Sequence, residues 1–118
     1  MAYLTKLTFA TAEIVLRVKR PYGAAGQALS FHLVCASITG TGTLEIEEGN
    51  TDDETQALDT LQSDGSTAVT QAISSANFKI NLYNADAALY HYLRFPAGLT
   101  GGTCLIYTNV PLDLTDVS

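Results

Sequence analysis

The chain has 118 residues, of which 47% are hydrophobic and 15% charged, and its net charge is −6. This length predicts one domain with one core, and an acidic balance without a basic stripe argues against a nucleic-acid-binding protein. Soluble domains carry about 25% charged residues on average, so the low charge indicates a surface that contacts other protein extensively.

Targeting and membrane signals are not evident. The first residues lack the long apolar core of a signal peptide, and no run approaches the roughly 18 apolar residues of a membrane helix. We therefore expect a protein that is made and kept in a cytoplasm and has no membrane partner.

The N-terminal part contains one clear strand pattern. Residues 1–11 have weak periodicity and are interpreted as an N-terminal arm or a first edge segment. From Glu13 to Lys19 apolar side chains recur at every second position, which predicts a strand. A short helix capped by Thr11 is the alternative, because Glu13 would then lie in its first turn.

A basic cluster closes this strand. Arg17, Lys19 and Arg20 lie within four positions of one another. They form either a solvated strand end or an electrostatic contact with an acidic partner surface.

The longest apolar run, Gln27 to Ile38, predicts a strand whose two faces differ. One face is mixed and includes His32, which suits a central strand or an interface. The other face is apolar and carries Leu29, Phe31, Leu33 and Cys35. Thr43 to Glu48 alternates as a second strand, and the glycine-containing turn between the two runs predicts a hairpin.

An acidic loop, Gly49 to Glu54, comes next. Its carboxylates could bind a hard cation such as calcium, but the loop lacks EF-hand spacing, so we favour a solvated loop. Ala57 to Gln62 fits a short strand or a helical turn. The segments that follow are interpreted as a turn, a weak β segment and an alternating strand, at Ser63–Ser66, Thr67–Ile73 and Phe78–Tyr83.

The clearest pattern is a C-terminal ribbon, with strands at Leu89–Phe95 and Thr103–Val110. Leu93 and Phe95 alternate with Tyr92 and Arg94, as in a strand with one buried face. Pro96 ends the first strand because it has no amide hydrogen. The three glycines that follow predict a hairpin-type connection to the second strand.

Seven to eight short strands without a convincing long helix predict an all-β fold. We expect residues 1–118 to form a single-domain antiparallel β-sandwich, and eight strands in two sheets would make it a jelly roll.

Catalytic and metal-binding signatures are missing from the sequence. There is no GxSxG elbow, HExxH motif or CxxC pair, so we expect neither an enzyme nor a cofactor. Cys35 and Cys104 lie in apolar strands and are predicted to be buried free thiols, since a disulfide would require their strands to face each other closely. His32 and His91 are interpreted as satisfied or interfacial histidines.

Tyrosines on the outer face of a sandwich have three interpretations. Tyr83, Tyr90, Tyr92 and Tyr107 can pack at the edge of the core, contact another protein, or stack on sugar rings. The absence of tryptophan argues against the sugar platform.

Four stretches carry a family resemblance: Gly40–Asp53, Tyr92–Phe95, Leu99–Cys104 and Pro111–Asp113. Over residues 27–113 the chain resembles the small jelly-roll capsid cement, or decoration, proteins of tailed bacteriophages. The resemblance implies an eight-stranded jelly roll that assembles as homotrimers on the capsid exterior, binds the major capsid protein and reinforces the shell. It also implies a virion protein that is synthesised in the host cytoplasm, without direct nucleic-acid contact.

On this resemblance, we expect the first 26 residues to supply shell or neighbour contacts through their basic cluster. A subunit interface is expected on the Tyr90 and Tyr92 side or on the His32 side of the long apolar strand. The predicted interface residues are therefore Arg17, Lys19, Arg20, His32, Tyr90 and Tyr92. The alternative function is a carbohydrate- or ligand-binding β-sandwich module of a phage fibre or another surface protein.

Overall fold

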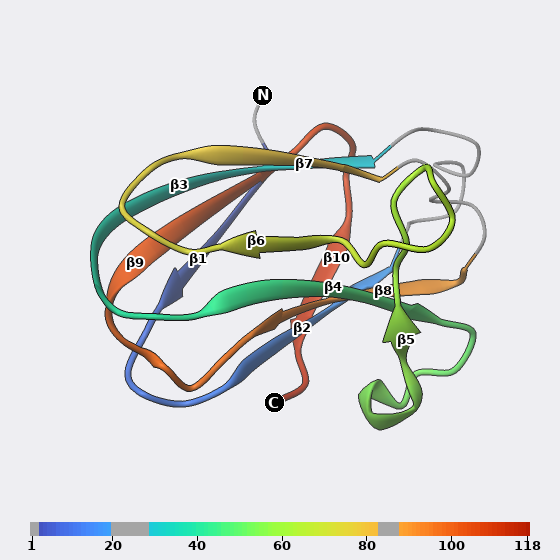
Figure 1. Cartoon of the computed structure of the whole chain (residues 1–118), viewed down its shortest axis with the longest axis horizontal. Helices are drawn as coiled ribbons and strands as arrows, with labels where there is room; N and C mark the ends of the chain where they lie inside the picture. Colours follow the sequence, from blue (N-terminus) through green and yellow to red (C-terminus); the bar gives the residue numbers. More distant parts are fainter. Residues whose placement is uncertain (1–2, 20–28, 83–87) are drawn as a thin grey trace.

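The computed structural model describes residues 3–19, 29–82 and 88–118, and this part of the chain folds as two antiparallel sheets that pack face to face (Figure 1). A four-stranded sheet has the order β1-β9-β3-β7, and a six-stranded sheet has the order β10-β2-β8-β4-β5, with β6 also paired to β4. The strands are β1 (Tyr3–Thr8), β2 (Ile14–Lys19), β3 (Leu29–Gly40), β4 (Thr43–Gly49), β5 (Leu58–Asp59), β6 (Thr70–Ala72), β7 (Phe78–Leu82), β8 (Tyr90–Phe95), β9 (Leu99–Thr108) and β10 (Asp113–Asp116). One 3₁₀ turn, η1 (Glu54–Gln56), precedes β5.

The strand pairing is nested. β1 pairs with β9, β2 with β8, β3 with β7 and β4 with β6, all antiparallel. The first half of the chain therefore runs alongside the second half as a long ribbon. The eight paired strands of this ribbon form two layers of four, β1-β9-β3-β7 and β2-β8-β4-β6, which is jelly-roll connectivity. β5 lies at the tip of the ribbon, and β10 adds to the edge beside β2.

Alternating side chains from both sheets build the core. Phe31, Leu33 and Ile106 point inward from the four-stranded sheet and are fully buried. Leu93 and Phe95 meet them from the six-stranded sheet. The inward faces predicted for the strands around residues 31 and 93 are confirmed, because a strand with one buried face has a period of two.

Both predicted hairpins are wrong. β3 and β4 lie in different sheets, and so do β8 and β9. The glycine-rich segments therefore carry the chain across the sandwich instead of folding a strand back on its neighbour. We call these two connections, residues 41–42 between β3 and β4 and residues 96–98 between β8 and β9, the crossings. They contact each other, since the Thr41 amide donates a hydrogen bond to the Gly98 carbonyl over 3.1 Å. Glycine and proline mark a change of direction in either case, so these signals could not distinguish the two connections.

Other segments resolve the alternatives left by the sequence. The N-terminal residues form β1 at the edge of the four-stranded sheet, in place of an arm. Residues 14–19 form a strand and not a helix. Residues 57–62 contain the two-residue strand β5 and an isolated bridge from Leu61 to Ala68, and Leu58 there is exposed. β10 was not predicted, because it is short and polar. In the described part of the chain, no helix has the length and apolar character needed to cross a membrane.

Candidate functional site

The register between β2 and β8 brings most of the predicted interface residues together. Arg17 pairs with Tyr92, and Lys19 pairs with Tyr90, so residues more than seventy positions apart share one patch on the outer face of the six-stranded sheet. The Arg17 guanidinium lies 5.7 Å from the centroid of the Tyr90 ring, a cation–π contact. Arg20, which belongs to the same predicted cluster, lies outside the described residues.

Tyr92 does not offer a contact surface. It is fully buried, although it faces away from the core, because the loop before η1 folds over it. Its hydroxyl donates to the carbonyl of Thr51 over 2.9 Å, and burial raises its pKa. Of the two tyrosines in this patch, Tyr90 is therefore the one that reaches the surface, and it is half-buried.

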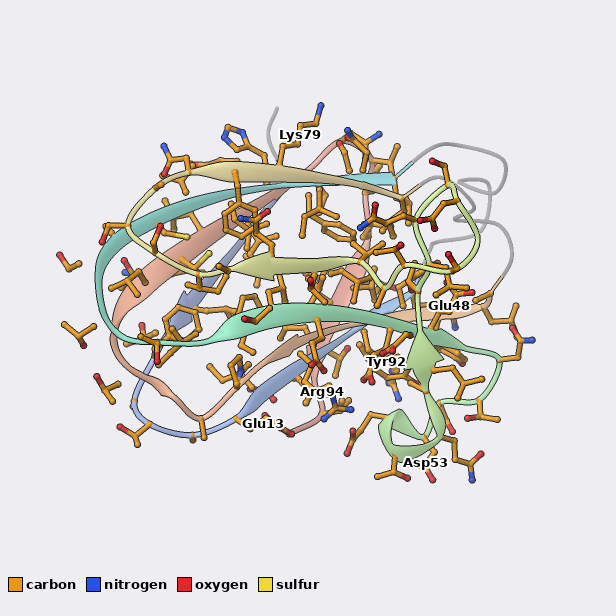
Figure 2. All side chains as sticks on the ribbon, in the orientation of Figure 1. Glu13, Glu48, Asp53, Lys79, Tyr92 and Arg94 are labelled. Carbon is orange, nitrogen blue, oxygen red and sulfur yellow. The ribbon has the colours of Figure 1, made fainter. Side chains whose placement is uncertain are left out.

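Arg94 organises the same face and was not singled out from the sequence. Its guanidinium reaches three carboxylates, at 2.9 Å from Glu13, 2.8 Å from Glu47 and 2.6 Å from Glu54. It also donates to the carbonyl of Glu54 over 3.3 Å. Figure 2 shows Arg94 beside Glu13, with Asp53 in the neighbouring loop. The Arg94 side chain on β8 therefore links β4, η1 and Glu13, the residue that precedes β2.

The protonation of Arg94 follows from these contacts. Burial alone lowers the pKa of Arg94, but the hydrogen bonds that Arg94 donates to Glu54 and Glu47 outweigh this effect, and the net shift of the pKa is upward. Arg94 thus stays charged, and two of its partners are themselves largely covered, with side-chain exposures of 14% for Glu47 and 25% for Glu54. Loss of one member of such a partly buried, charge-assisted network is costly, because it leaves the remaining charges uncompensated.

Tyr92→Phe is expected to lower the free energy of unfolding by about 1 kcal/mol, the usual net contribution of one hydrogen bond. The phenyl ring keeps the packing, so the change isolates the bond to Thr51. Urea unfolding checks the magnitude. The variant should also show faster amide hydrogen exchange in residues 50–56 alone. An unchanged exchange rate in this loop would contradict its role in covering Tyr92.

His32 lies on the other sheet, so the predicted interface residues do not form one site. On the outer face of the four-stranded sheet, His32 pairs with Tyr107 on one side and with Lys79 on the other. The His32 and Tyr107 rings are 6.0 Å apart between centroids. Beside them, Val34 pairs with Leu105. This face is a mixed surface of small, aliphatic and aromatic side chains with basic groups.

Charge is divided unequally between the two sheets. The strands of the four-stranded sheet, as the structure describes them, contain Lys6 and Lys79 but no aspartate or glutamate. Lys6 and Lys79 are both exposed. Carboxylates occur instead on β4, β5 and β10 of the six-stranded sheet and in the loop before η1. Figure 2 shows Lys79 on the opposite side of the molecule from Glu13, Arg94 and Asp53.

The acidic loop uses its carboxylates internally. Asp53 accepts hydrogen bonds from the hydroxyl and the amide of Thr55, and these bonds lower its pKa, while Glu54 binds Arg94. Among the described residues, no group of three or more histidines, cysteines or carboxylates is arranged to hold a metal ion.

His91 and the two cysteines, the other side chains that could take part in chemistry, are buried. His91 lies in the interior at 3% exposure, with its Nε2 4.0 Å from an oxygen of Glu48. Cys35 and Cys104 are free and buried, as predicted. They oppose each other across β3 and β9, with their sulfur atoms 3.5 Å apart.

No protein-family model matches this chain, and no curated protein or solved structure matches it either. The class defined by the fold is a single-domain β-sandwich with jelly-roll connectivity. Its two outer faces differ in charge, and this difference is the main guide to function.

Proposed function

We propose that this chain is a structural virion protein, a cement or decoration protein that binds the outer surface of a phage head and stabilises the shell. The observation that carries the proposal is that the four described strands of the four-stranded sheet contain no carboxylate, although the protein as a whole is acidic. The family resemblance of residues 27–113 and the low charge content support it further.

The outer face of the four-stranded sheet is the shell-binding face in this proposal. Its pleated surface carries Val34, Leu105 and Tyr107, partly exposed, between the two lysines. Apolar and aromatic groups with a basic rim suit a protein surface that carries carboxylates. The acidic six-stranded sheet then faces solvent on the outside of the particle.

Stabilisation by such a protein is collective. A contact that buries only some hundreds of Å² is weak by itself, but a copy that bridges two or more shell subunits gains avidity from each further contact. Every bound copy adds interface that must break before the shell opens. The proposal includes assembly as homotrimers, with the Arg17 and Tyr90 patch left free for contacts between copies.

The test is to mix purified protein with heads that lack it, pellet the heads, and measure both the bound protein and the temperature at which the heads release their contents. Saturable binding together with a higher release temperature is expected. Absence of binding at micromolar concentration would overturn the proposal. A glycan screen would then examine the alternative of a carbohydrate-binding module.

The double variant Lys6→Gln/Lys79→Gln is expected to bind heads about 10- to 100-fold more weakly, because each lost cation removes a favourable contact with the shell. Ser63→Glu/Ala72→Glu is the matched control. It makes the same change in net charge at two exposed positions outside the four-stranded sheet, one in the turn between β5 and β6 and one on β6, and should bind as the wild type does. Equal weakening of both variants would show that total charge, and not this face, governs binding.

A further inference from the structure

The two cysteines are placed for a covalent bond. Cys35 on β3 and Cys104 on β9 are directly opposite each other, and their sulfur atoms are 3.5 Å apart. Both strands lie in the middle of the four-stranded sheet. With only two cysteines in the chain, no other pairing competes within one molecule.

The backbone geometry of this pair also fits. The amide of Cys35 donates to the side-chain oxygen of Asn77 over 3.1 Å, on the β7 side of β3. It therefore points away from β9, which makes Cys35 and Cys104 a non-hydrogen-bonded pair. Opposite residues in such pairs have Cα atoms about 4.5 Å apart, within the span of about 4.4–6.8 Å that a disulfide bridges.

We propose that Cys35 and Cys104 are the site of a cross-strand disulfide that forms when the folded protein meets a peroxide. Cys35 keeps 5% exposure as a residue whereas Cys104 is fully buried, so in this proposal the oxidant reacts first at Cys35. Burial also raises the pKa of the Cys104 thiol, which keeps that sulfur protonated until its partner is activated.

The chemistry balances in two steps. Hydrogen peroxide oxidises the Cys35 thiol to a sulfenic acid and is itself reduced to one water molecule. The Cys104 sulfur then attacks the Cys35 sulfur, the new S–S bond forms, and the sulfenic hydroxyl leaves as a second water molecule with the proton of Cys104. The product joins β3 to β9 in the interior of the sandwich. This inference does not depend on the proposed function.

A disulfide that fits the native structure stabilises it by restricting the unfolded chain. The oxidised protein is therefore expected to melt about 10 °C above the reduced protein, and dithiothreitol should abolish the difference. The experiment treats native protein with hydrogen peroxide, removes the oxidant, and then unfolds the protein to titrate its thiols. Loss of both thiols, a mass lower by two hydrogen atoms and a monomeric band on a non-reducing gel are expected.

Cys35→Ser is the control, because Cys104 alone should stay reduced under the same treatment. Two titratable thiols in treated wild-type protein would overturn the proposal. Cross-linking between molecules would overturn it too, as would an oxidised protein that melts at or below the temperature of the reduced one. These outcomes depend on the wild-type chain, so they do not require a variant to fold.

Discussion

Arg94→Ala is expected to lower the free energy of unfolding by about 3 kcal/mol, because removal of one member of a partly buried ion-pair network leaves the others without compensation. Glu47 and Glu54 would keep their charges in a largely covered position. The variant also loses the bond to the Glu54 carbonyl that fixes η1. Urea or thermal unfolding measures the change.

Two further variants separate charge from packing at this site. Arg17→Ala removes an arginine from the neighbouring strand of the same face, where it makes one long bond, 3.4 Å to the carbonyl of Asp52, and a cation–π contact. Its cost should stay below about 1 kcal/mol. Adding Glu47→Gln and Glu54→Gln to Arg94→Ala should restore part of the lost stability, since the uncompensated charges are gone. Equal effects of Arg94→Ala and Arg17→Ala would contradict the assignment of Arg94 as the centre of the network.

Gly98→Ala is expected to destabilise the fold by about 2–3 kcal/mol, as overpacked sites do. A Cβ atom added at Gly98 would lie 2.2 Å from the carbonyl oxygen of Thr41. This neighbour is backbone in the other crossing between the sheets, so it cannot rotate away. The two crossings would have to separate, which would also weaken the bond from the Thr41 amide to the Gly98 carbonyl.

Gly49→Ala is the control for this steric argument. A Cβ atom there would have its nearest neighbour at 3.8 Å, an ordinary contact, and the change should stay within about 0.5 kcal/mol. Thermal unfolding of both variants checks the pair. A Gly98 variant as stable as the Gly49 variant would show that the crossings are not held in close contact.

Local sequence pattern predicted most of the longer strands and the inward faces of the central ones, but it did not predict which strands pair. Alternation around Phe31 and Leu93 follows from the pleat of a single strand, so it can be read from the sequence alone. Which strands pair depends on residues far away in the chain. The nested order places β8 and β9 in different sheets, and nothing in the sequence between them indicates this. The glycines near residues 40 and 98 therefore resembled hairpin turns.

The candidate site shows the same limit. The alternating pattern predicted that Tyr92 faces away from the core, and this is correct. Tyr92 is nevertheless buried, because a loop forty-one positions away covers it and supplies Thr51 as its hydrogen-bond partner. Arg94 also stands at an outward position, but its three glutamates come from distant segments. The low content of charged residues can be read from the composition. The absence of carboxylates from the strands of the four-stranded sheet could be recognised only once the strand order was known.

The most direct test of the proposed function is lysine acetylation of the protein, free and bound to phage heads, quantified at each lysine by mass spectrometry. Lys6 and Lys79 are exposed on the outer face of the four-stranded sheet, and both should become protected when the heads are saturated. Lys19, on β2 of the other sheet, reports separately on contacts between copies. If Lys6 and Lys79 react in the bound protein as they do in the free protein, this face does not contact the shell and the account is contradicted.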